Sequence, residues 1–255
     1  MIEVFILENF LHTVDTVPDG LGFALFDATH LIWLGIFLAV TVANCIWYRK
    51  LSQKGKGIWK KVMALLIVAD ELFKMAMLTI GGRYTFSYLP LHLCSINIFL
   101  IAIHAWKPVK TLSGFLYTVC IPGAIAALLF PTWTELPVLN FMHLHSFTVH
   151  ILLAMYPIVL GTAGELAPTW KQLHKYLGLL VVMAIPIYIV NLLLDTNFMF
   201  LMSADPGNPL YIFEQLWGSH LLGFPVIIGA ILIVMYIPME LWRHLRAKKA
   251  AKELV

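Results

Sequence analysis

Seven stretches of about 20 predominantly apolar residues follow one another along the 255-residue chain. An α-helix needs roughly this length to cross the hydrocarbon core of a bilayer. Unpaired backbone groups are costly in hydrocarbon and the stretches show no alternation of period two, so the sequence predicts helices. The expected fold is all-α, a polytopic membrane protein with seven transmembrane helices. They are expected at about 28–48, 58–80, 88–106, 111–130, 141–162, 173–195 and 217–242.

The composition supports this class of protein. Charged residues make up 12% of the chain, about half the usual ~25%, and 60% of the residues are apolar or aromatic. A soluble domain of this size cannot hide so much apolar surface. A soluble enzyme, a disordered chain and a disulfide scaffold are therefore excluded together.

The basic residues predict the orientation, because lysine and arginine accumulate in cytoplasmic loops. When the loops are assigned alternately to the two sides, 15 of the 17 basic residues fall on one side, and the exceptions are Lys74 and Arg83. The N-terminus is therefore expected outside and the C-terminus inside. The chain is expected to form one domain, 1–255, with 1–27 as an extracellular or interfacial segment and 243–255 as a basic cytoplasmic tail. The basic residues then meet anionic lipids, and no nucleic-acid partner is expected.

Polar groups inside a membrane are costly, so their depth is the main indication of function. They gather in the outer half of the predicted bundle, where Asp70 and Lys74 are four residues apart and can pair. The sequence therefore predicts a polar cavity open to the outside or to lipid, although each group also has a structural interpretation as an ion pair or interhelical hydrogen bond. The predicted binding residues are Asp70, Glu71, Lys74, Arg83, Asn97, His143, His145, Asn191, Asp195 and His220.

Two kinds of chemistry are open at this depth. Cys94 or His92 could act as a nucleophile with His150 as its base, which requires the two groups to lie within hydrogen-bond distance. Histidines with Asp70 or Glu71 could instead hold a metal ion, but their spacing fits no metal motif, so no metal or cofactor is expected.

Two short stretches support a resemblance. Residues 90–96 read Pro-Leu-His-Leu-Cys-Ser-Ile, and residues 195–201 read Asp-Thr-Asn-Phe-Met-Phe-Leu, followed by Asp-Pro at 205–206. With these stretches the chain resembles the YwaF-like family of bacterial seven-span integral membrane proteins. That family is distantly similar to eukaryotic transmembrane phospholipid acyltransferases that use a cysteine and a histidine. The resemblance implies a bacterial cell membrane location, phospholipid substrates, and Cys94 and His150 as the reactive pair.

The resulting hypothesis is a lipid acyltransferase or transacylase that acts in the outer half of the bilayer. Cys94 attacks an ester, His150 moves the proton, and His92 or Asn97 donates a hydrogen bond to the oxyanion. Acyl-CoA is cytoplasmic, so an outward site favours another phospholipid as the donor. The alternatives are a transporter or a small-ligand or lipid-binding protein with an outward-facing cavity, and a scaffold for another membrane protein.

Overall fold

The computed structural model describes residues 9–166, 168–204 and 208–252; for 242, 243 and 245–252 it describes the backbone alone. The described residues form helices and loops without any strand. The chain divides into two compact units, Met1–Met202 and Ser203–Val255, which are described separately here. The expectation of one domain stays a prediction.

Each predicted apolar stretch falls on helical structure. Five of these helical segments are long and apolar enough to cross a membrane among the described residues: Ala28–Lys50, Lys110–Leu129, Phe141–Thr162, Trp170–Leu194 and His220–Leu241. The first unit contains α2 (Ala28–Lys50), α3 (Gln53–Ile80), α4 (Leu93–Trp106), α5 (Lys110–Phe115), α6 (Ile121–Leu129), α7 (Phe141–Thr162) and α8 (Leu173–Leu194). A single π-helical segment, Leu116–Cys120, joins α5 to α6.

The remaining two helices explain why five is fewer than the seven spans expected. α3 is long enough, but it carries charged residues along its length. α4 has 14 residues, which corresponds to a rise of only about 21 Å. The seven-span count and the orientation of the termini therefore stay predictions.

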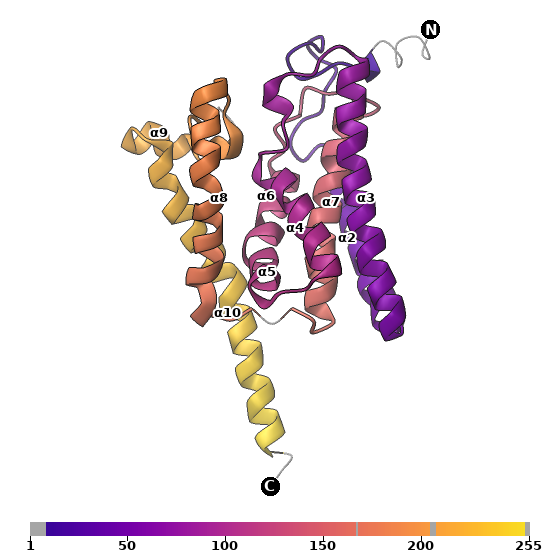
Figure 1. The fold of residues 1–255 in the computed structure, drawn as a ribbon, viewed down its shortest axis with the longest axis vertical. Helices are drawn as coiled ribbons and strands as arrows, with labels where there is room; N and C mark the ends of the chain where they lie inside the picture. The colour runs from indigo at the N-terminus through magenta and orange to yellow at the C-terminus, as the bar shows by residue number, and fades with distance from the viewer. Residues whose placement is uncertain (1–8, 167, 205–207, 253–255) are drawn as a thin grey trace. The chain divides into compact units, whose positions relative to one another are not determined.

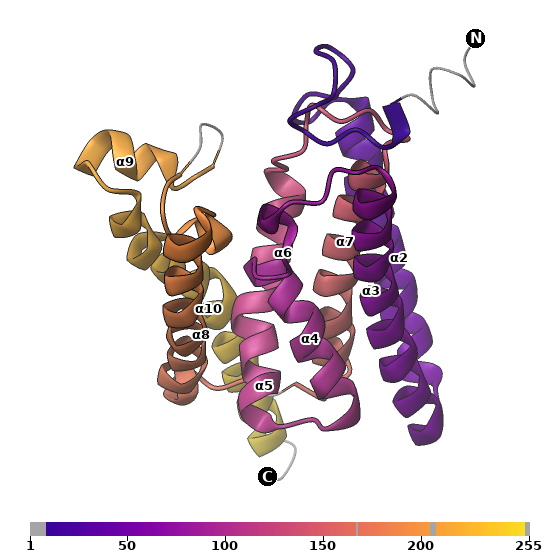
Figure 2. The same ribbon diagram turned by 45° about the horizontal axis from the view of Figure 1, so that its top comes forward.

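α7 is the central helix of the first unit and packs against α2, α3, α4 and α6 (Figure 1, Figure 2). Fifteen of its 22 residues are buried, whereas α2 buries only three of its 23. The apolar residues that α2 exposes face outward from this bundle, as expected for a helix in contact with lipid. Functional groups on α7 are therefore held by neighbours on several sides.

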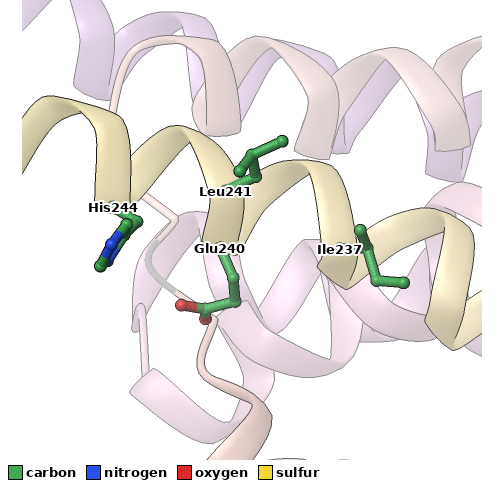
Figure 3. A pocket seen from close by; sticks show the side chains of 4 residues that line it. All are labelled: Ile237, Glu240, Leu241 and His244. Carbon is green, nitrogen blue, oxygen red and sulfur yellow. The ribbon is translucent and has the colours of Figure 1, made fainter.

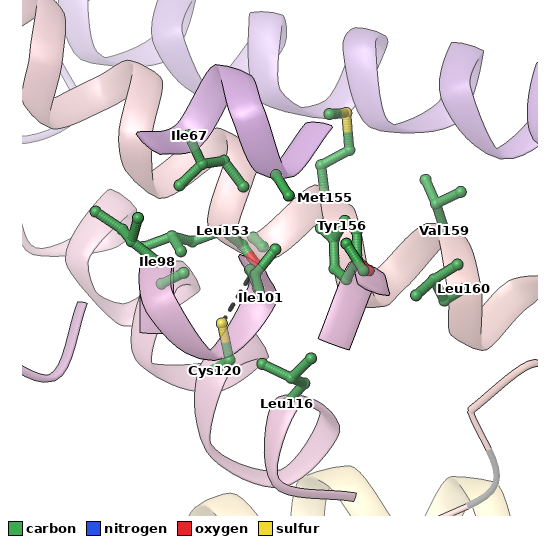
Figure 4. Packing of buried hydrophobic residues seen from close by; sticks show 14 of the residues in the cluster. Ile67, Ile98, Ile101, Leu116, Cys120, Leu153, Met155, Tyr156, Val159 and Leu160 are labelled. Atoms are coloured by element: carbon green, nitrogen blue, oxygen red, sulfur yellow. Dashed lines mark hydrogen bonds between the residues drawn. The ribbon is translucent and has the colours of Figure 1, made fainter. Parts of the chain in front are cut away.

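Aliphatic side chains from α3, α4, the π-helical segment and α7 fill the core of the first unit (Figure 4). Ile67, Ile101, Leu116 and Leu153 are fully buried there. The Cys120 thiol lies in the same cluster and donates a hydrogen bond to the carbonyl of Leu153 at 3.4 Å. Cys120 thus acts as a small packing residue, as its position in an apolar stretch predicts.

A polar cluster near the C-terminal end of α7 is centred on Glu165, which follows the helix. Its carboxylate accepts hydrogen bonds from the Tyr48 hydroxyl at 2.7 Å and the Lys60 ammonium at 3.0 Å, and Lys56 lies 3.7 Å away. Partial burial raises the pKa of Glu165, but these hydrogen bonds and the charges of Lys60 and Lys56 outweigh it and hold the pKa below its usual range. Glu165 thus ties the end of α7 to α2 and α3.

This lowered pKa predicts a pH-dependent contribution to stability. A carboxyl whose pKa is lower in the folded state stabilises the fold above its unfolded pKa, and the contribution is lost as pH falls through the folded pKa. Replacement of Glu165 by Gln should lower the free energy of unfolding by about 1 kcal/mol at pH 7. Thermal unfolding in detergent should show that the difference between the two proteins shrinks below pH 4. A difference that stays constant between pH 7 and pH 3.5 would contradict this assignment.

The second unit contains α9 (Tyr211–Trp217), a short 3₁₀ turn (His220–Leu222) and α10 (Gly223–Lys252). Gly218 ends α9 with φ +71, a conformation that residues with a side chain rarely adopt. Gly223 begins α10 beside the Phe213 ring, and a Cβ there would lie 2.4 Å from that ring. These two glycines let α9 fold back against the start of α10. Much of the expected C-terminal tail is part of α10.

Candidate active site

Cys94 on α4 and His150 on α7 lie in direct contact. The Cys94 Sγ is 3.1 Å from the His150 Nε2. The other ring nitrogen, Nδ1, donates to the carbonyl of Ser146, one turn earlier on α7, at 2.6 Å. Because Nδ1 carries the hydrogen in this arrangement, the lone pair of Nε2 faces the thiol. The structure therefore contains a nucleophile, a base and a group that orients the base.

Cys94 also occupies the first turn of α4. His92 is the N-cap residue of this helix, and its side chain makes no capping hydrogen bond. The first intrahelical bond is from the Ile96 N–H to the His92 carbonyl, and the backbone N–H groups of Leu93 and Ser95 have no backbone acceptor among the described residues. A helix N-terminus stabilises a thiolate, and free N–H groups can stabilise an oxyanion.

The charged residues of α3 form a buried cluster with His145 of α7. The Lys74 ammonium pairs with the Glu71 carboxylate at 2.5 Å, and both side chains are at least nine-tenths buried. The Asp70 carboxylate lies instead 2.8 Å from the His145 Nδ1. The predicted pairing of Asp70 with Lys74 is therefore wrong. Residues three or four positions apart share a helix face, so Lys74 could pair with either Glu71 or Asp70. The Asp70 carboxylate faces His145, and Lys74 therefore pairs with Glu71.

His143 is already saturated by the protein. Its Nδ1 donates to the carbonyl of Leu136 at 3.1 Å, and its Nε2 accepts from the Trp33 indole at 2.9 Å. The ring is fully buried between Phe23 and Phe147. Neither nitrogen is available to a substrate, so His143 holds α7 to α2 and to the loop before it.

Unlike His143, Asn97 and Arg83 keep polar atoms that the described residues do not use. Asn97 lies one turn after Cys94 on α4 and is 2% exposed, yet its carbonyl oxygen has no hydrogen-bond partner within the described ranges. Arg83 lies in the loop after α3, partly exposed, and its guanidinium forms no ion pair among the described residues. Both groups therefore have unused polar capacity, and that of Asn97 lies one turn from Cys94.

His92 contacts the loop that follows α8. Its Nδ1 accepts from the Met199 N–H at 3.4 Å, which leaves the hydrogen of a neutral ring on Nε2. The Phe198 and Phe200 rings lie 5.2 Å and 6.0 Å from the imidazole. Met199 and Phe200 have positive φ values of 59 and 55, which is costly for residues with a side chain. The loop at 195–201 therefore packs against the His92 ring.

Asn191 holds this strained loop in place. Its amide oxygen accepts from the Phe198 N–H at 2.8 Å and from the Thr196 hydroxyl at 3.0 Å, and its amide nitrogen donates to the Phe198 carbonyl at 3.0 Å. Asn191 is 1% exposed. It thus supports the loop and is not free for a substrate.

Two further predicted site residues lie elsewhere. Asp195 is exposed and ends α8 in a left-handed conformation, φ 51. His220 belongs to the second unit, where its Nδ1 lies 3.8 Å from the Glu214 carboxylate. The Asp-Pro pair at 205–206 is outside the described residues.

Two hollows in the surface of the described residues are lined by residues other than Cys94 and His150. One runs along α10 and is lined by Ile237, Glu240, Leu241 and His244 (Figure 3). The other lies between residues 20–27 and Thr134 and Glu135. Neither is lined by Cys94 or His150, although Cys94 is partly exposed. In the part of the chain that the structure describes, no group of three His, Cys, Asp or Glu side chains could hold a metal ion.

The sequence of residues 25–236 matches the TMEM164 family, a match that covers most of the chain. The chain belongs to the TMEM164 family. No curated protein and no solved structure matches it. Membership of the TMEM164 family together with the apolar helices establishes a membrane protein with several membrane-spanning helices.

Sequence reasoning missed one residue of this TMEM164-family site. The Trp133 indole stacks on the His150 imidazole, with 5.3 Å between ring centroids and 10° between planes. Trp133 lies in the loop between α6 and α7, where tryptophan is typical of a membrane interface. No periodicity relates this loop to α4 or α7, so the sequence contains no signal for the contact.

Proposed function

We propose that this protein is a membrane-embedded lipid acyltransferase or transacylase with Cys94 as its nucleophile. The observation that carries the proposal is the 3.1 Å contact between the Cys94 thiol and the His150 Nε2, with Nδ1 fixed by the Ser146 carbonyl. A buried thiol is otherwise inert. The neighbouring base and the N-terminus of α4 supply the stabilisation that a thiolate needs.

The first half-reaction forms a thioester. His150 accepts the Cys94 proton, and the thiolate attacks the ester carbonyl of a donor phospholipid. The oxyanion accepts hydrogen bonds from the free backbone N–H groups at the start of α4 and from the Nε2–H of His92. The ester C–O bond then breaks, and the protonated His150 gives its proton to the departing alkoxide oxygen, which leaves as the hydroxyl of a lysophospholipid.

The second half-reaction reverses these roles. The hydroxyl of a lysolipid acceptor gives its proton to His150 and attacks the thioester carbonyl. The C–S bond breaks, the acyl chain is now on the acceptor, and the Cys94 thiolate recovers its proton from His150. The cycle needs no cofactor, because one ester is exchanged for another.

Lys74 and Arg83 are the two cations considered for binding the phosphate of the head group. Lys74 already pairs with Glu71, so the pair is nearly neutral and orients the site. Arg83 has no such partner among the described residues and is partly exposed, which suits a phosphate. His145, Asp70 and Asn97 complete the proposed polar lining. His143 and Asn191 are saturated by hydrogen bonds within the protein, and Asp195 is exposed at the end of α8, so these three are not part of it.

The proposal includes seven spans, with the N-terminus outside and the C-terminus inside a bacterial plasma membrane. The distribution of basic residues supports this orientation. In this arrangement the N-terminal ends of α4 and α7 lie in the outer half of the bilayer. A phospholipid donor then reaches Cys94 from within the membrane, whereas cytoplasmic acyl-CoA does not.

The test uses purified full-length protein in detergent with an isotope-labelled diacyl phospholipid and an unlabelled lysolipid. Lipid mass spectrometry should detect label in the newly acylated acceptor, and the transfer should be lost in His150→Ala. His174→Ala is a matched control, because this histidine lies at the start of α8. No transfer by the wild type across several head groups would contradict the enzyme and would favour a binding or transport role.

A further inference from the structure

Trp133 covers one face of the His150 imidazole and takes no part in the proton transfers of the proposed reaction. The two rings are nearly parallel, 10° apart, with centroids separated by 5.3 Å. The imidazole contacts Cys94 at its edge, through Nε2. Trp133 therefore touches the base at its face and leaves its reacting nitrogen free.

The position of Trp133 is fixed from outside the helices. Its loop accepts a hydrogen bond from the Phe23 N–H to the Thr134 carbonyl at 2.8 Å. Gly22 packs against this carbonyl so closely that a Cβ would lie 1.9 Å from its oxygen. The Trp133 ring also meets Phe147 edge-on at 5.2 Å. The segment before α2 thus fixes the loop that carries Trp133 beside His150.

A structural hydrogen bond does not account for this tryptophan. Trp133 is 7% exposed, and its indole N–H has no hydrogen-bond partner in the part of the chain that the structure describes. Tryptophan offers the strongest π face toward a cation, and a flat ring stacked on imidazole also restricts its rotation. The contact is therefore best explained by what the indole face does to the imidazole.

We propose that Trp133 is a positioning residue that holds the His150 ring with Nε2 toward Cys94 and stabilises its protonated form. The transfer of the thiol proton to His150 then produces a thiolate and an imidazolium whose charge is shared with the indole face. The inference rests on the proposed function, because it concerns the same Cys94–His150 pair. Its test, however, measures the thiol without any lipid.

The titratable groups around this pair come from α3, α4, α7 and the π-helical segment. Asp70, Glu71 and Lys74 of α3 act electrostatically on His150 or Cys94, as does His92 of α4, and Cys120 lies beyond Cys94. His145 of α7 lies between two of these carboxylates, with its Nδ1 2.8 Å from Asp70 and its Nε2 3.8 Å from Glu71. Substitutions at Trp133 leave all of these groups in place, so a change in thiol ionisation reports the indole face.

The experiment measures alkylation of Cys94 by iodoacetamide between pH 5.5 and pH 10 on the full chain in detergent. Peptide mass spectrometry follows Cys94, with Cys45 as the internal reference. Replacement of Trp133 by Leu should move the pH midpoint of Cys94 alkylation upward by about one unit and slow the reaction about tenfold at pH 7. Replacement by Phe, which keeps a smaller aromatic face without the N–H, should slow the reaction by only about threefold.

Trp33→Leu is the matched control, because Trp33 stacks on Phe147 in the same aromatic cluster without touching His150. It should leave the Cys94 profile unchanged. A Trp133→Leu profile that coincides with the wild type, or an equal shift in Trp33→Leu, would overturn the inference. Should Trp133→Leu fail to fold, Trp133→Phe against Trp33→Phe decides, with a shift of about threefold expected in the first alone.

The two proposals fail in different ways. If wild-type protein transfers no acyl chain but Trp133→Leu still shifts Cys94 alkylation, the enzyme assignment falls and the role of Trp133 stands. If transfer occurs and all Trp133 variants share one alkylation profile, the enzyme stands and the role of Trp133 falls.

Discussion

Cys94→Ala should abolish acyl transfer, with a fall of about 10³-fold or more. The substitution removes the Sγ atom that lies 3.1 Å from the His150 Nε2, and with it the atom that carries the acyl chain. Cys94 is only partly buried, so the loss of one sulfur atom costs little packing. The rate of label transfer to the lysolipid acceptor measures the effect.

Cys45→Ala supplies the matched control for this variant. Cys45 is also a partly buried cysteine within a helix, but its sulfur meets the Thr162 hydroxyl at 3.4 Å, at the other end of α7. Transfer by Cys45→Ala should equal that of the wild type. Retention of the wild-type rate by folded Cys94→Ala would remove the thiol from the mechanism and leave His92 as the alternative nucleophile.

Lys74→Met should produce the largest loss of stability in the first unit. It leaves the Glu71 carboxylate, whose side chain is 5% exposed, without its ammonium partner. Removal of one member of a buried ion pair costs about 3–5 kcal/mol, because the other charge stays buried and unpaired. The free energy of unfolding, measured by denaturant titration in mixed micelles, should fall by that amount.

A double substitution separates charge from packing. Lys74→Met combined with Glu71→Gln removes both charges and should recover about 2 kcal/mol or more of the lost stability. Lys60→Met is the matched control, since its partly exposed pair with Glu165 should contribute about 1 kcal/mol or less. A Lys74→Met protein as stable as Lys60→Met would show that Glu71 is not confined as described.

The positions of the helices could be read from the sequence, because apolar length alone determines where a chain can enter hydrocarbon. The ends were less accessible. The stretch predicted at 88–106 begins as a helix only at Leu93, since Pro90 and the 3₁₀ turn Phe86–Tyr88 precede it. This delay places Cys94 in the first turn of α4, which apolar length cannot predict.

The positions of the polar residues along the helices could also be read from the sequence, but their partners could not. Asp70, Glu71 and Lys74 share one face of α3, so the pairing depends on what α7 presents to each of them. In the sequence, Asn191 resembles a site residue because it is a polar residue near the predicted outer end of its span, four residues before Asp195. The reversal that follows α8 contains no glycine. Non-glycine residues in left-handed conformations give no turn signal, and Asn191 is the residue that holds that reversal.

The most direct test of the account is a search for an acyl group on Cys94 itself. Full-length protein is incubated with a labelled diacyl phospholipid and no acceptor, and its peptides are analysed by mass spectrometry. The account predicts one labelled acyl chain on the Cys94 peptide, released by hydroxylamine as a thioester and absent from His150→Ala. Active acyl transfer without any acyl group on Cys94 would contradict it.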